Sequence, residues 1–135
     1  MQDTKPFSEH IKFLKGEIET ALQKIPLDHS PDYLYEPLKY ILKGKGKRLR
    51  PVLVHLSGQA FKADPEDLMK VGVAVELLHN FTLVHDDIMD GDDTRHGQPT
   101  VHKKWDDSAA ILAGDGLFIL AQLMLSGLHP SIHQR

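Results

Sequence analysis

Residues 73–97 read VAVELLHNFTLVHDDIMDGDDTRHG and carry the clearest structural signal in the chain. The first half of this stretch is almost entirely apolar, which is typical of a buried helix. On an ideal helix His79, Asp86 and Asp90 lie near one azimuth, because offsets of seven and eleven residues are close to whole turns. One helix face therefore carries an imidazole and, two turns later, two carboxylates. In all, five aspartates fall within eight residues: Asp86, Asp87, Asp90, Asp92 and Asp93.

The acidic cluster calls for a cation. Gly91, the expected C′ residue, places the cluster at a helix C-terminus, where the partial negative charge already disfavours carboxylates. Hard oxygen ligands on a short segment suit Mg²⁺, which proteins commonly hold with one or two carboxylates plus substrate phosphates. A solvated acidic turn is the alternative, and the apolar helix before it argues against that. An EF-hand loop is excluded, because its twelfth position would be Gly97 or Val101 instead of Glu.

Composition narrows the class of protein. The chain of 135 residues has the length of one domain, and its apolar fraction of 41% is enough for a core. A net charge of −3 argues against a general nucleic-acid binder. The absence of cysteine excludes disulfides, thiolate catalysis and Cys-based zinc sites. The polar N-terminal stretch lacks the apolar core of a signal peptide, so a cytoplasmic protein is expected.

The longest apolar run covers residues 109–125. It is interrupted by Gly114, Asp115, Gly116 and Gln122, so a buried helix is expected here and a membrane span is not. Asp115 would then be a buried acid, and a structural hydrogen bond is a better expectation for it than catalysis.

The apolar spacing is helical throughout, and no alternating run predicts a strand. Ser8 is the expected N-cap of the first helix, and Asp64, with Pro65 and Asp67 after it, starts the central one. Asp106 or Asp107 can cap the last helix. The prediction is an all-α, antiparallel helix bundle. Its helices are expected at 8–24, 31–42, 52–61, 66–89 and 108–126.

A basic loop precedes the third predicted helix. Residues 42–51 read LKGKGKRLRP, with five basic residues and two glycines among residues 43–50. Lys47 and Arg50 are three apart, so both side chains can point the same way. A Lys point charge beside an Arg fork suits a diphosphate. A solvated basic patch of the nuclear-localisation or heparin-binding kind is an equally open interpretation at this point.

Two further residues have two interpretations each. His79 can be a satisfied core or interface histidine, or it can contact a ligand. Its alignment with the aspartates makes these two interpretations equally open. Arg95 can pair with the acidic cluster or hold a phosphate that also touches the metal. The nine histidines do not form a metal-binding set, and HExxH is absent.

Several segments together resemble the trans-prenyl diphosphate synthases of the polyprenyl synthetase family. LVHDDIMDGDD is similar to their first aspartate-rich motif, DDxxD, and GKGKRLRP to their upstream GGKRxRP motif. ELLHNFTLVHDD, DTRHGQPTVH and AAILAGDGLF follow in the family's order. The resemblance covers residues 38–125 and implies a bundle of the isoprenoid synthase type.

The resemblance also implies a role for each matching residue. Asp86 and Asp90 would bind Mg²⁺ as metal ligands in catalysis, with Asp87 as a secondary contributor. Arg95 would hold the diphosphate of the allylic prenyl substrate, and stabilise its negative charge as it leaves. Isopentenyl diphosphate would be bound by three residues: Lys47, Arg50 and His79. The second arginine of the family is here His96, a substrate contact with one N–H donor when neutral.

Product length is limited in the family by residues before the first aspartate. Here these are Phe81 and Thr82, which resemble the geranylgeranyl-type pattern, so a C15–C20 product is expected with C20 favoured. An ideal helix places Phe81 about 140° from Asp86, and this inference therefore depends on resemblance alone.

Family members are longer and carry a second aspartate-rich motif that this chain lacks. Residues 1–135 are therefore expected to be the N-terminal part of a single polyprenyl synthetase domain, truncated and inactive alone. Uncovered apolar faces, and the family's habit, predict a homodimer. Two alternatives remain: a non-catalytic subunit, although such subunits generally lose their aspartates, and a terpene cyclase, although a cyclase needs no second diphosphate site.

Overall fold

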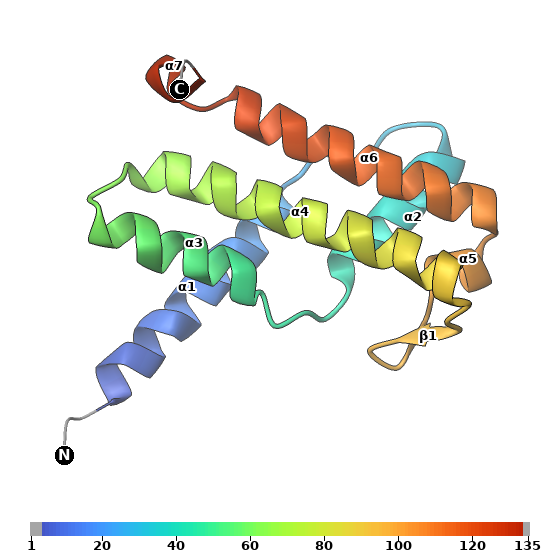
Figure 1. Ribbon diagram of the computed structural model, residues 1–135. Coiled ribbons are helices and arrows are strands. Elements are labelled where there is room, and N and C mark those ends of the chain that lie inside the picture. The colour runs from blue at the N-terminus through green and yellow to red at the C-terminus, as the bar shows by residue number, and fades with distance from the viewer. Residues whose placement is uncertain (1–3, 134–135) are drawn as a thin grey trace.

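The computed structural model describes residues 4–133, so both ends of the predicted domain, 1–3 and 134–135, lie outside it. Helices dominate this part of the chain, as predicted (Figure 1). The helices are α1 (Lys5–Gln23), α2 (Asp32–Lys43), α3 (Leu49–Ala60), α4 (Pro65–Asp90), α5 (Val101–Lys104), α6 (Asp107–Ser126) and α7 (Pro130–His133). One correction is needed: two short strands, β1 (Thr94–Arg95) and β2 (Gln98–Pro99), pair antiparallel where a loop was expected.

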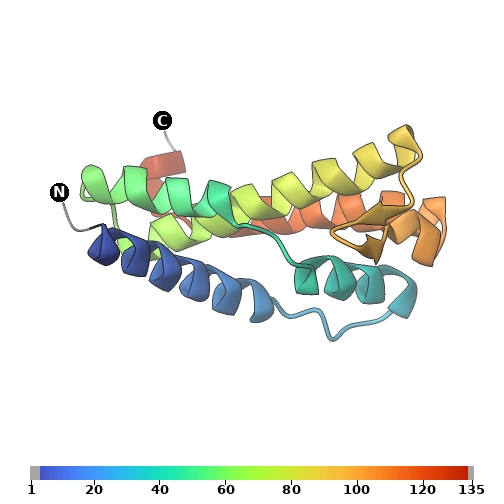
Figure 2. The same cartoon turned by 90° about the horizontal axis from the view of Figure 1, so that it is seen from below.

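Helix α4 is the centre of the bundle. It packs along much of its length against the antiparallel α6, and α3 folds back on it after a short turn (Figure 1). Helices α1 and α2 form a second layer, in which α1 contacts α3 and α4 and α2 contacts α6 (Figure 2). The core contains Ile18, Leu22, Leu77 and Leu117, each at most 1% exposed. Burying one such side chain stabilises the fold by roughly 1.5–3 kcal/mol.

Small residues let α6 approach α4 closely. Ala109, Ala110, Ala113 and Ala121 have no exposed surface. At Gly114 the approach is closest, because a Cβ there would lie 2.3 Å from Nε2 of His85 on α4. The spacing of these two helices therefore depends on the missing side chain at position 114.

The opposite face of α6 is apolar and exposed, so the expectation of a fully buried helix holds for one face only. The exposed residues include Ile111, Leu112, Phe118, Ile119 and Leu123. Among the described residues, α6 alone is long and apolar enough to span a membrane, and the core helix of a folded domain passes the same test. The prediction for Asp115 was wrong: its side chain is 58% exposed and its nearest partner is His85, 3.9 Å away.

Local signals located most helix ends correctly. Asp64 accepts hydrogen bonds from the backbone N–H groups of Glu66 and Asp67, and Asp106 accepts one from Ala109. Gly91 ends α4 with a φ of 69°, as a C′ glycine does.

Two predicted starts were wrong. Helix α1 begins at Lys5, because Pro6 suits the first turn, and Ser8 inside the helix donates its hydroxyl to the Lys5 carbonyl. Helix α3 begins at Leu49, three residues before the predicted position, so part of the basic segment belongs to its first turn.

Candidate functional site

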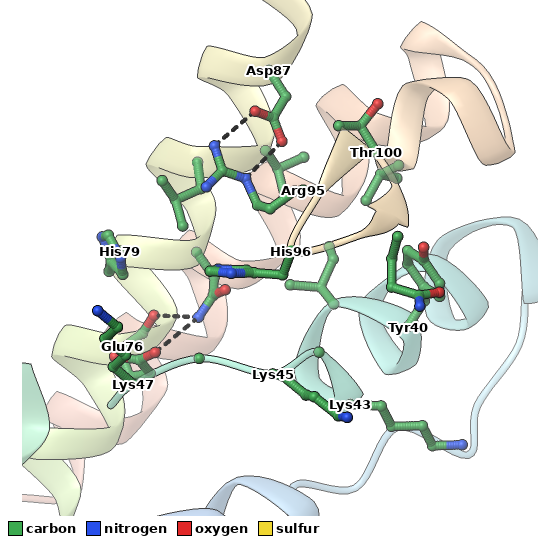
Figure 3. Close-up of a pocket in the computed structure, with 18 of the residues that line it drawn as sticks. Tyr40, Lys43, Lys45, Lys47, Glu76, His79, Asp87, Arg95, His96 and Thr100 are labelled. Atoms are coloured by element: carbon green, nitrogen blue, oxygen red, sulfur yellow. Dashed lines mark hydrogen bonds and ion pairs between the residues drawn. The ribbon is translucent and has the colours of Figure 1, made fainter. Parts of the chain in front are cut away.

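A cavity of about 700 Å³ lies where the basic loop, α4 and the β1–β2 hairpin meet (Figure 3). It brings together five of the predicted substrate-binding residues. These are Lys47, Arg50, His79, Arg95 and His96. Six lysine or arginine side chains and two carboxylates line the cavity, so it carries a strong positive charge.

The basic loop, residues 44–50, runs into the first turn of α3 and is anchored by Arg48. This arginine is 4% exposed and has a φ of 52°, in the left-handed region that non-glycine residues rarely adopt. Its guanidinium donates to Glu19 on α1, to Glu76 on α4 at 2.8 Å, and to the Gly44 carbonyl at 3.0 Å. Because Arg48 turns inward, its neighbours Lys47 and Arg50 are left at the cavity wall.

His79 contacts the basic segment directly. Arg50 donates a hydrogen bond of 3.1 Å to Nε2 of His79, which requires a neutral ring with its proton on Nδ1. Partial burial, and next the positive charge of Arg50, hold the pKa of His79 below its ordinary value. His79 is half-buried and lines the cavity wall, so it is not a core histidine, and its contact with a ligand stays a prediction.

The hairpin carries the sixth cation of the lining, Arg95. Its turn residues, His96 and Gly97, have φ values of 52° and 77°, as a two-residue type I′ turn requires. Arg95 donates two hydrogen bonds, of 2.9 and 2.7 Å, to the carboxylate of Asp87, and these bonds raise the pKa of Arg95. Figure 3 shows this pair beside the cavity, with the His96 ring directed from the hairpin toward α4. Arg95 thus fulfils the ion-pair interpretation while still lining the cavity.

Neighbouring elements hold the hairpin in place. The Tyr40 hydroxyl on α2 donates to the Pro99 carbonyl at 2.7 Å, and Lys104 lies 4.3 Å from the centre of the Tyr40 ring. Thr100 donates to the Asp92 carbonyl at 2.8 Å. Tyr40 therefore connects α2 to the hairpin that presents Arg95.

The two predicted metal ligands lie outside the cavity lining. Asp86 and Asp90 are exposed near the end of α4, one turn apart, while Asp87 between them is 4% exposed. Neither Asp86 nor Asp90 forms an ion pair within the described residues. In that same part of the chain, no three His, Asp or Glu side chains converge on a metal site. Two free carboxylates still fit Mg²⁺, which commonly takes one or two and completes its shell with water and phosphate.

The predicted chain-length residues face a different neighbour. Phe81 packs against His85 and Phe118, with ring centres 4.8 and 5.7 Å apart, and so lies on the α6 side of α4. The Thr82 hydroxyl donates to the His79 carbonyl. Neither residue lines the cavity described here.

The residues that support the site carry little signal in the sequence. Arg48 is one of five basic residues within residues 43–50, and Glu19 and Tyr40 lie outside every motif described above. Glu76 gave one usable signal: it is an acid within an apolar helix, and a buried acid needs a partner.

Comparisons with known proteins find relatives in one family. A family model described as "Polyprenyl synthetase" matches residues 31–134. The geranylgeranyl diphosphate synthase of Methanosarcina mazei is 42% identical over 118 residues, which cover 87% of this chain and 36% of that protein. The farnesyl diphosphate synthase of Bacillus subtilis is 38% identical over 116 residues, covering 84% of this chain and 38% of that protein.

Solved structures extend the likeness to the fold. The crystal structure of geranylgeranyl pyrophosphate synthetase from Pyrococcus horikoshii Ot3 matches with a TM-score of 0.80 and 38% identity, covering 94% of this chain and 40% of that one. The bundle is therefore of the isoprenoid synthase type, as predicted. The chain belongs to the polyprenyl synthetase family. It spans less than half the length of these relatives.

Proposed function

We propose that the protein containing these residues is a Mg²⁺-dependent prenyltransferase that condenses isopentenyl diphosphate with an allylic prenyl diphosphate. The observation that carries this proposal is the excess of positive charge in the cavity. Glu76 and Asp87, its two carboxylates, are already paired with Arg48 and Arg95. Among the described residues, three further cations of the lining form no ion pair: Lys45, Lys47 and Arg50. Lys43 is attracted to Asp28 without forming a salt bridge. A cavity with unpaired cations favours a polyanion such as a diphosphate.

The residues divide into two groups with different tasks. Lys47, Arg50 and His79 bind the diphosphate of isopentenyl diphosphate at one wall, and His96 adds a donor from the hairpin. Arg95 holds the allylic diphosphate and stabilises the negative charge that grows on its leaving oxygen.

Asp86 and Asp90 are the proposed holders of Mg²⁺, which when bound acts as a Lewis acid and template for the departing diphosphate. Their exposure without an ion-pair partner, at the negative end of the α4 dipole, supports a cation supplied from outside the chain. The acceptor's double bond attacks the allylic carbon, and the released diphosphate takes the proton that is lost. No side-chain nucleophile is required.

We also propose a product length and an assembly state for the whole protein. A short-chain product is supported by relatives named as geranylgeranyl, farnesyl and geranylfarnesyl diphosphate synthases. We favour C20, with Phe81 and Thr82 limiting the chain. The exposed apolar face of α6 supports a homodimer, and a cytoplasmic location is proposed with it.

The basic loop separates this function from the two alternatives. A terpene cyclase binds one diphosphate and has no use for Lys47 and Arg50 at a second position. A non-catalytic subunit has no use for the free carboxylates of Asp86 and Asp90.

The decisive experiment uses the full-length protein with Lys47 and Arg50 both changed to Ala. A synthase should bind isopentenyl diphosphate roughly 100-fold more weakly or worse, since each of the two charge-assisted contacts contributes about 1.5–3 kcal/mol. Its affinity for the allylic substrate should change much less. Lys12→Ala, an exposed lysine on α1, is the control. Unchanged affinity for isopentenyl diphosphate would reject the proposal, and mass spectrometry of the wild-type product would measure its length.

A further inference from the structure

Helix α1 reaches the basic loop from outside the region matched by the family model. That match begins at residue 31, whereas α1 ends at Gln23. Two side chains of α1 nevertheless hydrogen-bond to the basic segment. Gln23 donates to the Leu42 carbonyl at 3.0 Å, just before the loop, and Glu19 accepts from Nε of Arg48 near its far end. The loop is therefore fastened to α1 near both ends.

All three nitrogens of the Arg48 guanidinium form hydrogen bonds. Its Nε, Nη1 and Nη2 each donate to an oxygen from a different element, α1, α4 and the loop itself. Although Arg48 borders the cavity, its side chain is only 3% exposed, and its hydrogen bonds hold the loop in place.

Gly46 shows how tightly the loop lies over this cluster. A Cβ at position 46 would be 3.2 Å from Nη1 of Arg48 and 3.7 Å from the carboxylate of Glu76. The backbone therefore passes directly over the ion pair, and the loop's course is set by the position of the guanidinium.

We propose that Glu19 and Arg48 are positioning residues: α1, through Glu19, fixes Arg48 in its inward, left-handed conformation and thereby aims Lys47 and Arg50 at the cavity. The inference builds on the proposed function, since it assigns the orientation of the diphosphate-binding cations. Arg48 has a φ of 52°, an unfavourable conformation that its three hydrogen-bond partners maintain.

The test compares two single-charge changes on one helix of the full-length protein. Glu19→Gln removes the charge that faces Arg48, and Glu17→Gln removes an exposed charge two residues away. The probe is inorganic diphosphate, with its dissociation constant measured by calorimetry. Amide hydrogen exchange is measured in parallel for residues 44–50 and for the hairpin, 94–99.

Glu19→Gln should weaken diphosphate binding by about fivefold, the range for a partly exposed ion pair, and should speed exchange in residues 44–50. The hairpin amides should be unaffected, and Glu17→Gln should match the wild type in both measurements. If Glu19→Gln lowers the melting temperature but leaves loop exchange and diphosphate affinity unchanged, the role is only structural and the inference is wrong.

Arg48→Lys provides an independent variant, because it keeps the charge and loses the fork. Its loss of diphosphate affinity should exceed that of Glu19→Gln, and wild-type behaviour would overturn the inference. If Arg48→Lys does not fold, the Glu19→Gln measurements still test the inference, because Glu19 is half-exposed and its substitution should be tolerated. If the wild-type protein binds no diphosphate, the proposed function fails, while exchange in residues 44–50 still tests positioning.

Discussion

The two walls of the cavity, the basic loop and the β1–β2 hairpin, both present cations but hold them differently. In the loop, the arginine that fixes the backbone, Arg48, is buried, and the presented cations, Lys47 and Arg50, carry no ion pair within the described residues. In the hairpin one arginine has both tasks, because Arg95 ties the hairpin to Asp87 and also lines the cavity.

In the loop, different residues therefore provide stability and ligand binding. In the hairpin, Arg95 provides both. A diphosphate can reach Lys47 and Arg50 without breaking an ion pair. At Arg95 it must compete with Asp87 for the same guanidinium. The loop is therefore a preorganised site, and the hairpin is a site that changes partners on binding.

The largest expected effect comes from removing the loop's anchor. Arg48→Ala leaves Glu76 buried without its cation and should lower the free energy of unfolding by about 3–5 kcal/mol. Urea denaturation measures this. Lys47→Ala, on the neighbouring exposed residue, should stay within about 0.5 kcal/mol of the wild type. If both substitutions lowered the free energy of unfolding equally, Arg48 would not be the residue that stabilises the loop while Lys47 is left to bind the ligand.

A smaller effect is expected at the hairpin. Asp87→Asn removes the charge partner of Arg95 and should lower stability by about 1.5–3 kcal/mol. Affinity for inorganic diphosphate should not fall, since the Arg95 charge is no longer neutralised. Asp93→Asn, which breaks an exposed pair with Lys103, serves as the control and should cost no more than about 1 kcal/mol. If Asp87→Asn lowered diphosphate affinity together with stability, Arg95 would not be exchanging Asp87 for the diphosphate on binding.

The hydrogen bond between α2 and the hairpin should contribute less to stability than the Arg95–Asp87 pair. Tyr40→Phe removes the hydrogen bond to the Pro99 carbonyl and should cost about 1 kcal/mol. Hydrogen exchange should increase in residues 94–99 and stay constant in 44–50. Tyr35→Phe on the same helix is the matched control. Faster exchange in the loop would mean that the two walls are not independent.

The smallest expected effect depends on pH. The pKa of His79 is lowered in the folded state, so below about pH 6.5 the unfolded chain binds more protons and stability falls as pH falls. Above that pH the ring is neutral in both states and the effect is absent. His79→Gln should flatten the decline in stability between about pH 6.5 and pH 5.5. His129→Gln, an exposed histidine far along the chain, should leave more of it in place.

The sequence predicted those features that depend on local signals. Asp64, Asp106 and Gly91 mark helix ends through bonds within a few residues, so their roles could be read directly. Ser8 is not the N-cap, because Pro6 already suits the first turn of α1 two residues earlier.

The site was predictable in its charges but not in its orientation. Residues 44–48 form a loop without a repeating period, so nothing local shows which of its basic side chains turns inward, and the partner Glu19 lies 29 residues from Arg48. On α4, the face that lines the cavity carries Glu76, Leu83 and Asp87, which have the same helical spacing as the predicted set but are rotated from it. That rotation is set by tertiary packing.

The close approach of α6 to α4 at Gly114 has a consequence for the acidic motif. His85, the residue that a side chain at 114 would displace, directly precedes Asp86 and Asp87. A single added methyl group at position 114 would displace the His85 ring, which donates a hydrogen bond to the Ile111 carbonyl and packs against Phe81. The side-chain packing next to the acidic motif therefore depends on a position outside that motif, where a hydrogen atom takes the place of a side chain.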